Sequence, residues 1–311
     1  MDVVTAGEAM GLLLAESGTP LRRADRFVRS VAGSESNVAV GLARLGHRVA
    51  FCGRVGTDAV GGWVRDTLRA EGVDVRALRE DSDRPTGLLL RDSPAGGRTV
   101  SVSYHRTGSA ASALSTRDVD EELVASARVV FVSGITAMLS PSAEDFVDHL
   151  VAVAARAGAH VAFDPNVRLR LAGVERWRRT YARFAGRVDT LLVSDEELDL
   201  LDLPDDPAAL VLGRTTTVVV THGAGGATAA TAGGTTRIDA RRVVVADPVG
   251  AGDAFTAGWL SAWLRGLPPA DALREAAAVA SLVVSVPTDI AGLPTARERD
   301  QILLSGGDVD R

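Results

Sequence analysis

Short runs of branched apolar residues recur along the chain, and stretches with helical spacing separate most of them. The runs cover residues 3–5, 49–51, 129–133, 161–163, 190–193, 218–221 and 243–246. Strands that alternate with helices are typical of βαβ units, in which helices cover a mostly parallel sheet. The 311 residues are enough for one large domain of this kind. The sequence therefore predicts an α/β fold with a mostly parallel central sheet.

Two helices can be placed from the spacing of their apolar residues. The first follows Gly33, with Ser36 as the expected N-cap and Gly46 at its end, and its apolar positions are Val38, Leu42 and Leu45. The second is expected from about residue 252 to 265, and its apolar face carries Phe255, Trp259 and Trp263.

Two segments, about residues 11–31 and 86–106, interrupt this alternation. In the second, "TGLLLRD" and "RTVSVSYHR" flank "SPAGG" as two strands flank a turn. We expect these segments to form a small antiparallel sheet beside the main one, as insertions in a single domain that spans residues 1–311. The C-terminal "SGGDVDR" is expected to be disordered.

Composition excludes several classes of function. The net charge of −6 disfavours a broad nucleic-acid surface, and the single cysteine, Cys52, which we assign to the core, excludes a disulfide framework. No 18-residue apolar run or basic leader is present, so a cytoplasmic location is expected. The chain has no lysine, which rules out a phosphate loop that needs one.

The stretch "DPVGAGDAF", residues 247–255, places small residues where a strand is expected to lead into a helix. Gly250, Ala251 and Gly252 allow backbone N–H groups to approach a phosphoryl oxygen at the positive end of the helix dipole. Asp253 follows in the first turn, where the dipole favours the ionised form, so we expect a weak base that still orients an alcohol. The alternative is a tight turn with a capping aspartate.

Three motifs in this order resemble the ribokinase-like, or PfkB, family of sugar kinases. They are "AGSESNVAVGLARLG", "GRVGTDAVG" and "DPVGAGD", which matches the family signature D-T-x-G-A-G-D except that Pro248 replaces threonine. The resemblance covers nearly the whole chain. It implies a three-layer α/β/α sandwich with a small β lid, Asp253 as catalytic base, an anion hole at residues 250–252, and ATP with Mg²⁺ as cofactors.

The resemblance also implies nucleotide and metal residues. "VTHGAGG" is similar to the family's turn beside adenine and ribose, which assigns Gly223 and Gly226 to the nucleotide together with Ser194, Gly250 and Gly252. "SDEE" resembles the motif N-x-x-E, so Glu197 is expected to organise Mg²⁺ through water, with Ser194 in place of asparagine. From the residues alone, the first stretch reads as an ordinary glycine turn and the second as a capped, solvated helix start.

Within the family the chain resembles 2-keto-3-deoxygluconate kinases through "RPTG", "SYHRTGSAAS", "VSGIT" and "FDPNVRLRL". Arg106 and Arg168 form a pair suited to a carboxylate, although each can instead be an ordinary surface ion pair. Leu89 departs from the tyrosine that related kinases can carry. The other expected substrate residues are Gly33, Asn37, Tyr104, which can also simply pack, Ile135 and Asp289.

The predicted reaction is transfer of a phosphoryl group from ATP to 2-keto-3-deoxygluconate, which gives the 6-phosphate. The alternatives are a kinase for another sugar, such as fructose, a keto-deoxygalactonate or a nucleoside, and a non-catalytic sugar-acid sensor. Because exposed lid strands offer edges for pairing, we also expect a dimer or larger homo-oligomer.

Overall fold

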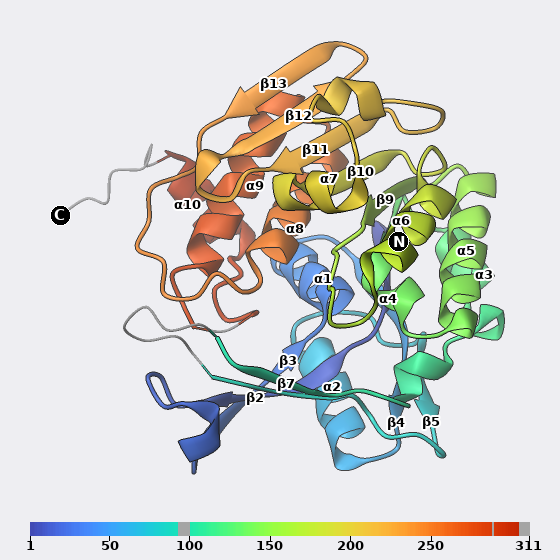
Figure 1. The fold of residues 1–311 in the computed structure, drawn as a ribbon, viewed down its shortest axis with the longest axis vertical. Coiled ribbons are helices and arrows are strands. Elements are labelled where there is room, and N and C mark those ends of the chain that lie inside the picture. The colour runs from blue at the N-terminus through green and yellow to red at the C-terminus, as the bar shows by residue number, and fades with distance from the viewer. Residues whose placement is uncertain (93–99, 288, 305–311) are drawn as a thin grey trace.

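The computed structural model describes residues 1–92, 100–287 and 289–304, and its centre is a nine-stranded sheet with the order β13-β12-β11-β10-β9-β8-β1-β4-β5 (Figure 1). Seven neighbouring strands are parallel. They are β1 (Val3–Gly7), β4 (Val49–Gly56), β5 (Leu78–Asp81), β8 (Val129–Ser133), β9 (His160–Asp164), β10 (Thr190–Ser194) and β11 (Thr217–Thr221). The antiparallel strands β12 (Ala227–Thr231) and β13 (Gly234–Ile238) complete one edge. The predicted α/β class is confirmed.

Helices cover both faces of this sheet, because successive residues of each strand point to opposite sides. Val3 packs into one apolar cluster and Val4 into the other. The first cluster lies under α1 (Ser34–Arg44), α2 (Ala59–Ala70), α8 (Ala251–Leu264) and α9 (Pro269–Val283). The second lies under α3 (Glu121–Ala125), α4 (Gly134–Met138), α5 (Pro141–Arg156), α6 (Val174–Phe184) and α7 (Asp195–Leu201). Cys52 is buried in the second cluster, as predicted, and α10 (Ala296–Leu304) packs on α9.

A second sheet of four strands lies beside the first, at the lower edge of Figure 1. Its order is β3 (Phe27–Ala32), β2 (Met10–Ala15), β6 (Leu88–Arg91) and β7 (Val102–His105). The two outer pairs are antiparallel, as predicted, but β2 and β6 are parallel, because each sequence segment supplies one pair and the two pairs join side by side. The proposed turn "SPAGG" and the C-terminal "SGGDVDR" lie outside the described residues.

Two local predictions are wrong. Residues 243–246 form no strand, and Val244 is 89% exposed, because this segment runs along the surface instead of pairing within the sheet. Ser36 does not cap α1. The helix begins at Ser34 after Gly33, and the Ser36 hydroxyl donates a hydrogen bond to the Gly33 carbonyl.

The second predicted helix is confirmed as α8, in which Phe255 and Trp259 are buried. In the part of the chain that the structure describes, no helix has both the length and the apolar character needed to cross a bilayer.

Candidate active site

A cavity of about 730 Å³ lies between the second sheet and the carboxyl ends of the central parallel strands. Ligands of open α/β sheets gather at such strand ends, because loops and helix N-termini meet there. Twelve of the residues predicted from the sequence line this cavity. They are Gly33, Asn37, Tyr104, Arg106, Ile135, Arg168, Ser194, Glu197, Gly250, Gly252, Asp253 and Asp289.

The glycine turn opens directly into α8. Gly250 is the N-cap, and its φ of 85° lies in the left-handed region that favours glycine. A side chain there would also approach the Asp289 carbonyl oxygen to 3.0 Å. The turn therefore needs glycine both for its backbone conformation and for the close packing of the neighbouring loop.

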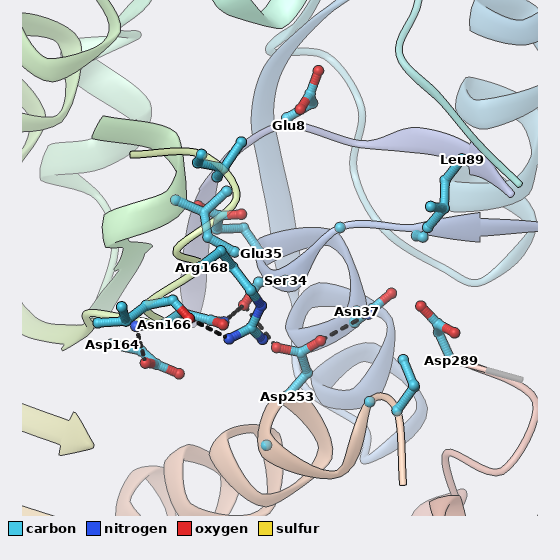
Figure 2. A pocket seen from close by; sticks show the side chains of 18 of the residues that line it. Glu8, Ser34, Glu35, Asn37, Leu89, Asp164, Asn166, Arg168, Asp253 and Asp289 are labelled. Atoms are coloured by element: carbon cyan, nitrogen blue, oxygen red, sulfur yellow. Dashed lines mark hydrogen bonds between the residues drawn. The ribbon is translucent and has the colours of Figure 1, made fainter. Parts of the chain in front are cut away.

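Asp253 stands at the start of α8 and faces the first turn of α1 (Figure 2). Its carboxylate accepts hydrogen bonds from the Ser34 hydroxyl at 2.7 Å and from the Asn37 amide at 2.8 Å. The Ser34 oxygen in turn accepts one from the Asn166 amide at 2.9 Å. Ser34 and Asn37 therefore fix the orientation of the carboxylate, and Asn166 holds Ser34 in place.

The electrostatics of Asp253 differ from the sequence-based expectation. Burial raises the pKa of this carboxyl above its ordinary value, and the hydrogen bonds from Ser34 and Asn37, with the charge of Arg168, only partly oppose that rise. The expectation that the helix dipole makes Asp253 a weak base is wrong, because desolvation is the larger effect here. A raised pKa makes the carboxylate a better proton acceptor.

Gly33 brings main chain close to the cavity wall. Its φ is 146°, and a Cβ there would lie 2.2 Å from the Glu8 carbonyl oxygen. Only glycine fits this close approach between the strand end after β1 and the start of α1. The same approach places Ser34 and Asn37 where they reach Asp253.

Two further carboxylates lie near Asp253, at the ends of β9 and β10. Burial, with the nearby charges of Glu197 and Asp253, raises the pKa of Asp164 well above its ordinary value. Glu197 accepts hydrogen bonds from the Val167 backbone N–H at 2.5 Å and from the Ser194 N–H at 2.9 Å. Ser194 and Glu197 thus form the capping box of α7, so the capped helix start is confirmed. The expectation that it is solvated is wrong for Glu197, which is 8% exposed.

The two predicted arginines have different environments. Arg106, on the second sheet, forms an ion pair with Glu8, whose side chain is 2% exposed. Glu8 also accepts a hydrogen bond from the Ser109 hydroxyl at 2.6 Å. Arg168 is exposed at the mouth of the cavity, and it donates to the Val167 carbonyl at 2.9 Å. Within the described residues no carboxylate forms an ion pair with Arg168.

A second cavity, of about 490 Å³, adjoins the first on the other side of the glycine turn. Both cavities are lined by Thr221, Pro248, Gly252 and Phe255. The predicted nucleotide residues Gly223 and Gly226 line the second cavity, as does Ala251. The exposed segment that includes Val243 and Val245 forms part of its wall, which accounts for branched residues outside the sheet.

This arrangement is a two-part site. One cavity holds an oriented carboxylate and an arginine. The other is lined mostly by small and apolar residues, together with Arg241 and Arg242, and a left-handed glycine turn at a helix N-terminus separates the two cavities. The model of the pfkB family of carbohydrate kinases matches residues 2–296. The chain belongs to the PfkB family of carbohydrate kinases. It is therefore a phosphotransferase that acts on a sugar hydroxyl.

Relatives of this PfkB kinase include several sugar-acid kinases. It is 36% identical to the 2-dehydro-3-deoxygluconokinase of Bacillus subtilis, over 98% of this chain and 96% of the relative. It is 31% identical to the 2-dehydro-3-deoxygalactonokinase of Haloferax volcanii, over 100% of this chain and 99% of the relative. A solved fructokinase with bound ATP from Xylella fastidiosa superposes with a TM-score of 0.87 at 26% identity, over 98% of this chain and 99% of that one.

Sequence reasoning missed several residues of this PfkB kinase that line the sugar-side cavity. They are Glu8, Ser34, Glu35, Arg91, Asp164 and Asn166. Glu35 is 1% exposed, and burial raises its pKa to about 7 although it accepts a hydrogen bond from Thr136 at 2.6 Å. Asp164 and Asn166 stand in the quoted stretch "FDPNVRLRL", and acids at a strand's carboxyl end were the available signal.

Proposed function

We propose that this kinase transfers the γ-phosphoryl group of ATP to an acidic keto-deoxy sugar, 2-keto-3-deoxygluconate, to give its 6-phosphate. The observation that carries the proposal is Arg168. It lines the cavity of Asp253 and forms no ion pair within the described part of the chain, and its charge acts on Asp253 and Asp164. A guanidinium that forms no ion pair within the protein is available to bind the carboxylate of a substrate. Its planar set of N–H donors matches the two oxygens of a carboxylate.

The surface above the sugar supports a deoxy substrate. Met10 and Leu89, both 5% exposed, line the cavity from the second sheet together with Ala32 and Val102. These side chains offer no hydrogen bond to a hydroxyl, whereas they pack well against a methylene group. Leu89, which replaces a tyrosine of related kinases, extends this apolar surface. The two named sugar-acid kinases among the relatives agree with the assignment.

In the proposed reaction, Ser34 and Asn37 hold Asp253 so that one of its carboxylate oxygens faces the terminal hydroxyl of the sugar. The hydroxyl oxygen attacks the γ-phosphorus, the bond to the β-γ bridging oxygen breaks, and the hydroxyl proton passes to Asp253. Backbone N–H groups of residues 250–252 bind the migrating phosphoryl oxygens. The adjoining cavity, with Gly223 and Gly226, holds the nucleoside.

Mg²⁺ fits the acids on the other side of Asp253. Burial, with the nearby charges of Glu197 and Asp253, raises the pKa of Asp164, so a cation at this position would relieve the repulsion. The described residues contain no group of three or more metal ligands. Mg²⁺ keeps several waters and binds through one or two carboxylates together with phosphates. Asp164 would hold it, Glu197 would act on it through water, and it would neutralise charge on the phosphates.

The second sheet would act as a lid that excludes water from the reacting groups, as an inserted part of one kinase domain. Its outer strand β3 exposes Phe27 and Val28, which are 36% and 58% accessible. We propose that this edge pairs with a second copy of the chain in a homodimer, and that the enzyme works in the cytoplasm, where ATP is available. Light scattering of the purified protein tests the dimer, and a monomer would reject it.

A coupled ADP-release assay tests the substrate. The panel consists of 2-keto-3-deoxygluconate, its galacto epimer, fructose and ribose, with Asp253→Asn as the inactive control. We expect kcat/KM for the keto-deoxy acids to exceed that for the neutral sugars by about tenfold or more, since one charge-assisted contact contributes that much. A higher kcat/KM for fructose or ribose would contradict the proposal. No sugar-dependent turnover with any of the four sugars would reject it.

A further inference from the structure

Arg91 ends strand β6 of the second sheet and is almost completely buried, with 1% of its side chain exposed. It forms ion pairs with Asp247 and Asp289, each at 2.8 Å. Asp247 stands just before the glycine turn, and Asp289 belongs to the loop that follows α9. One arginine thus joins three segments that are far apart in the sequence.

Both acids also contact the glycine turn. The Asp247 carboxylate uses its second oxygen to accept a hydrogen bond from the Val249 backbone N–H at 3.0 Å. The Asp289 carbonyl oxygen lies 3.0 Å from the position that a Cβ of Gly250 would occupy. Arg91 therefore contacts the glycine turn indirectly, through Asp247 on one side of the turn and through Asp289 on the other.

The charges give this contact an electrostatic consequence. Without Arg91, two buried carboxylates would stand beside the turn that receives a phosphoryl group, and like charges repel at close range in a low-dielectric site. Burial and the charges of Asp253 and Asp247 already raise the pKa of Asp289 to about 6, and Arg91 opposes that rise. Asp247 and Asp289 form no other ion pair within the described residues.

We propose that Arg91 is a positioning residue for phosphoryl transfer, which holds the glycine turn in place and cancels the charge of the two acids beside it. The inference rests on the proposed phosphoryl transfer. Its effect falls on the γ-phosphate, because the turn is the predicted site of that group. Binding of ADP, which lacks the γ-phosphate, should depend little on Arg91.

The test compares Arg91→Met with Arg299→Met. Arg299 is a matched control, because it is also buried and forms two ion pairs, with Glu275 and Asp300, but it lines neither cavity. We expect Arg91→Met to lower kcat by about tenfold or more, since buried acids are left without their cation, with the Kd for ADP within about twofold. Arg299→Met should lower the melting temperature but leave kcat unchanged.

The pH profile separates positioning from simple destabilisation. Three charged groups face Asp289, namely Arg91, Asp247 and Asp253. Loss of Arg91 should raise the pKa of Asp289 further, and the protonated acid no longer repels phosphate. The kcat optimum of Arg91→Met should therefore move to lower pH than in the wild type, and the profile of Arg299→Met should not move.

Several results would overturn the proposal. One is an Arg91→Met variant that loses thermal stability but keeps wild-type kcat and pH profile. Another is a loss of ADP affinity as large as the loss of kcat. If Arg91→Met does not fold, the double variant Arg91→Met/Asp289→Asn is compared with Asp289→Asn alone. Equal kcat values for these two variants would reject the positioning role of Arg91. Absence of wild-type turnover on every sugar would instead refute the proposed function, with ADP binding still measurable.

Discussion

Replacement of Arg106 and of Arg168 by methionine should have opposite consequences, because only Arg106 has a buried partner. Arg106→Met leaves Glu8, 2% exposed, without its cation. Breaking a buried ion pair costs about 3 to 5 kcal/mol. The hydrogen bond from Ser109 at 2.6 Å remains, so we take the lower end, about 3 kcal/mol. For a chain of this length that corresponds to a fall of about 5 °C in melting temperature.

Arg168→Met should hardly change stability, since the side chain is exposed and its recorded hydrogen bond is to a neighbouring carbonyl. It should instead remove a charge-assisted contact to the substrate carboxylate. Such a contact contributes about 1.5 to 3 kcal/mol, which is about a 10- to 150-fold loss in kcat/KM for the acidic sugar. The neutral comparison is 3-deoxyfructose, in which CH₂OH replaces the carboxylate. Its kcat/KM should fall much less, because for this sugar only the effect of the Arg168 charge on Asp253 is lost.

The assays are thermal melting and ADP-release kinetics with both sugars, and Arg170→Met is the control. Arg170 is two residues away, is exposed, lines the cavity and donates to a backbone carbonyl, that of Val102, at 3.4 Å. Unlike Arg168, it has no recorded effect on the pKa of Asp253. Its replacement should leave the preference for the acidic sugar intact. The reasoning is refuted if Arg168→Met lowers kcat/KM equally for both sugars. It is also refuted if the acid-specific loss appears in Arg106→Met alone.

Two other predictions follow from buried acids. Asp253→Asn should lower kcat by about 10²- to 10⁴-fold because the proton acceptor is lost, with ADP affinity retained by calorimetry; near-normal turnover would remove Asp253 as the base. Burial raises the pKa of Glu35 from 4.5 to about 7, so between these pH values the folded state holds a proton that the unfolded state has lost. The free energy of unfolding should therefore fall by about 3 kcal/mol as the pH rises from 4.5 to about 7. Urea unfolding of Glu35→Gln should show a flatter dependence between those pH values, and a wild-type slope would contradict the assignment.

The strands and the glycine turn were predictable because their signals are local. Each of the six confirmed strand predictions for the central sheet is a run of branched residues whose two faces are both buried, which leaves little choice of secondary structure. The run at 243–246 has the same composition but lies in an exposed segment beside the second cavity. Composition alone does not distinguish these two cases, since the difference depends on whether a neighbouring strand is available.

The partners of the site residues were not predictable, because they come from distant parts of the chain. Asp253 is held by Ser34 and Asn37, which are 219 and 216 residues away. No spacing rule connects such positions. The pKa of Asp253 was misjudged for the same reason. The helix dipole can be deduced from local sequence, whereas burial depends on α1 and on the strand ends that close over the carboxylate.

The arginines of the cavity show why residue type alone did not define the substrate site. Arg91 lies between two acids, Arg106 pairs with one, and Arg168 contacts a backbone carbonyl. A guanidinium that pairs with a buried carboxylate contributes to the stability of the fold, because its removal leaves a buried charge without compensation. A guanidinium without such a partner still has its charge to offer. The sequence treats Arg106 and Arg168 as equivalent, but in the fold only Arg106 forms an ion pair with Glu8. This difference is the reason why we propose Arg168 for the recognition of an acidic sugar.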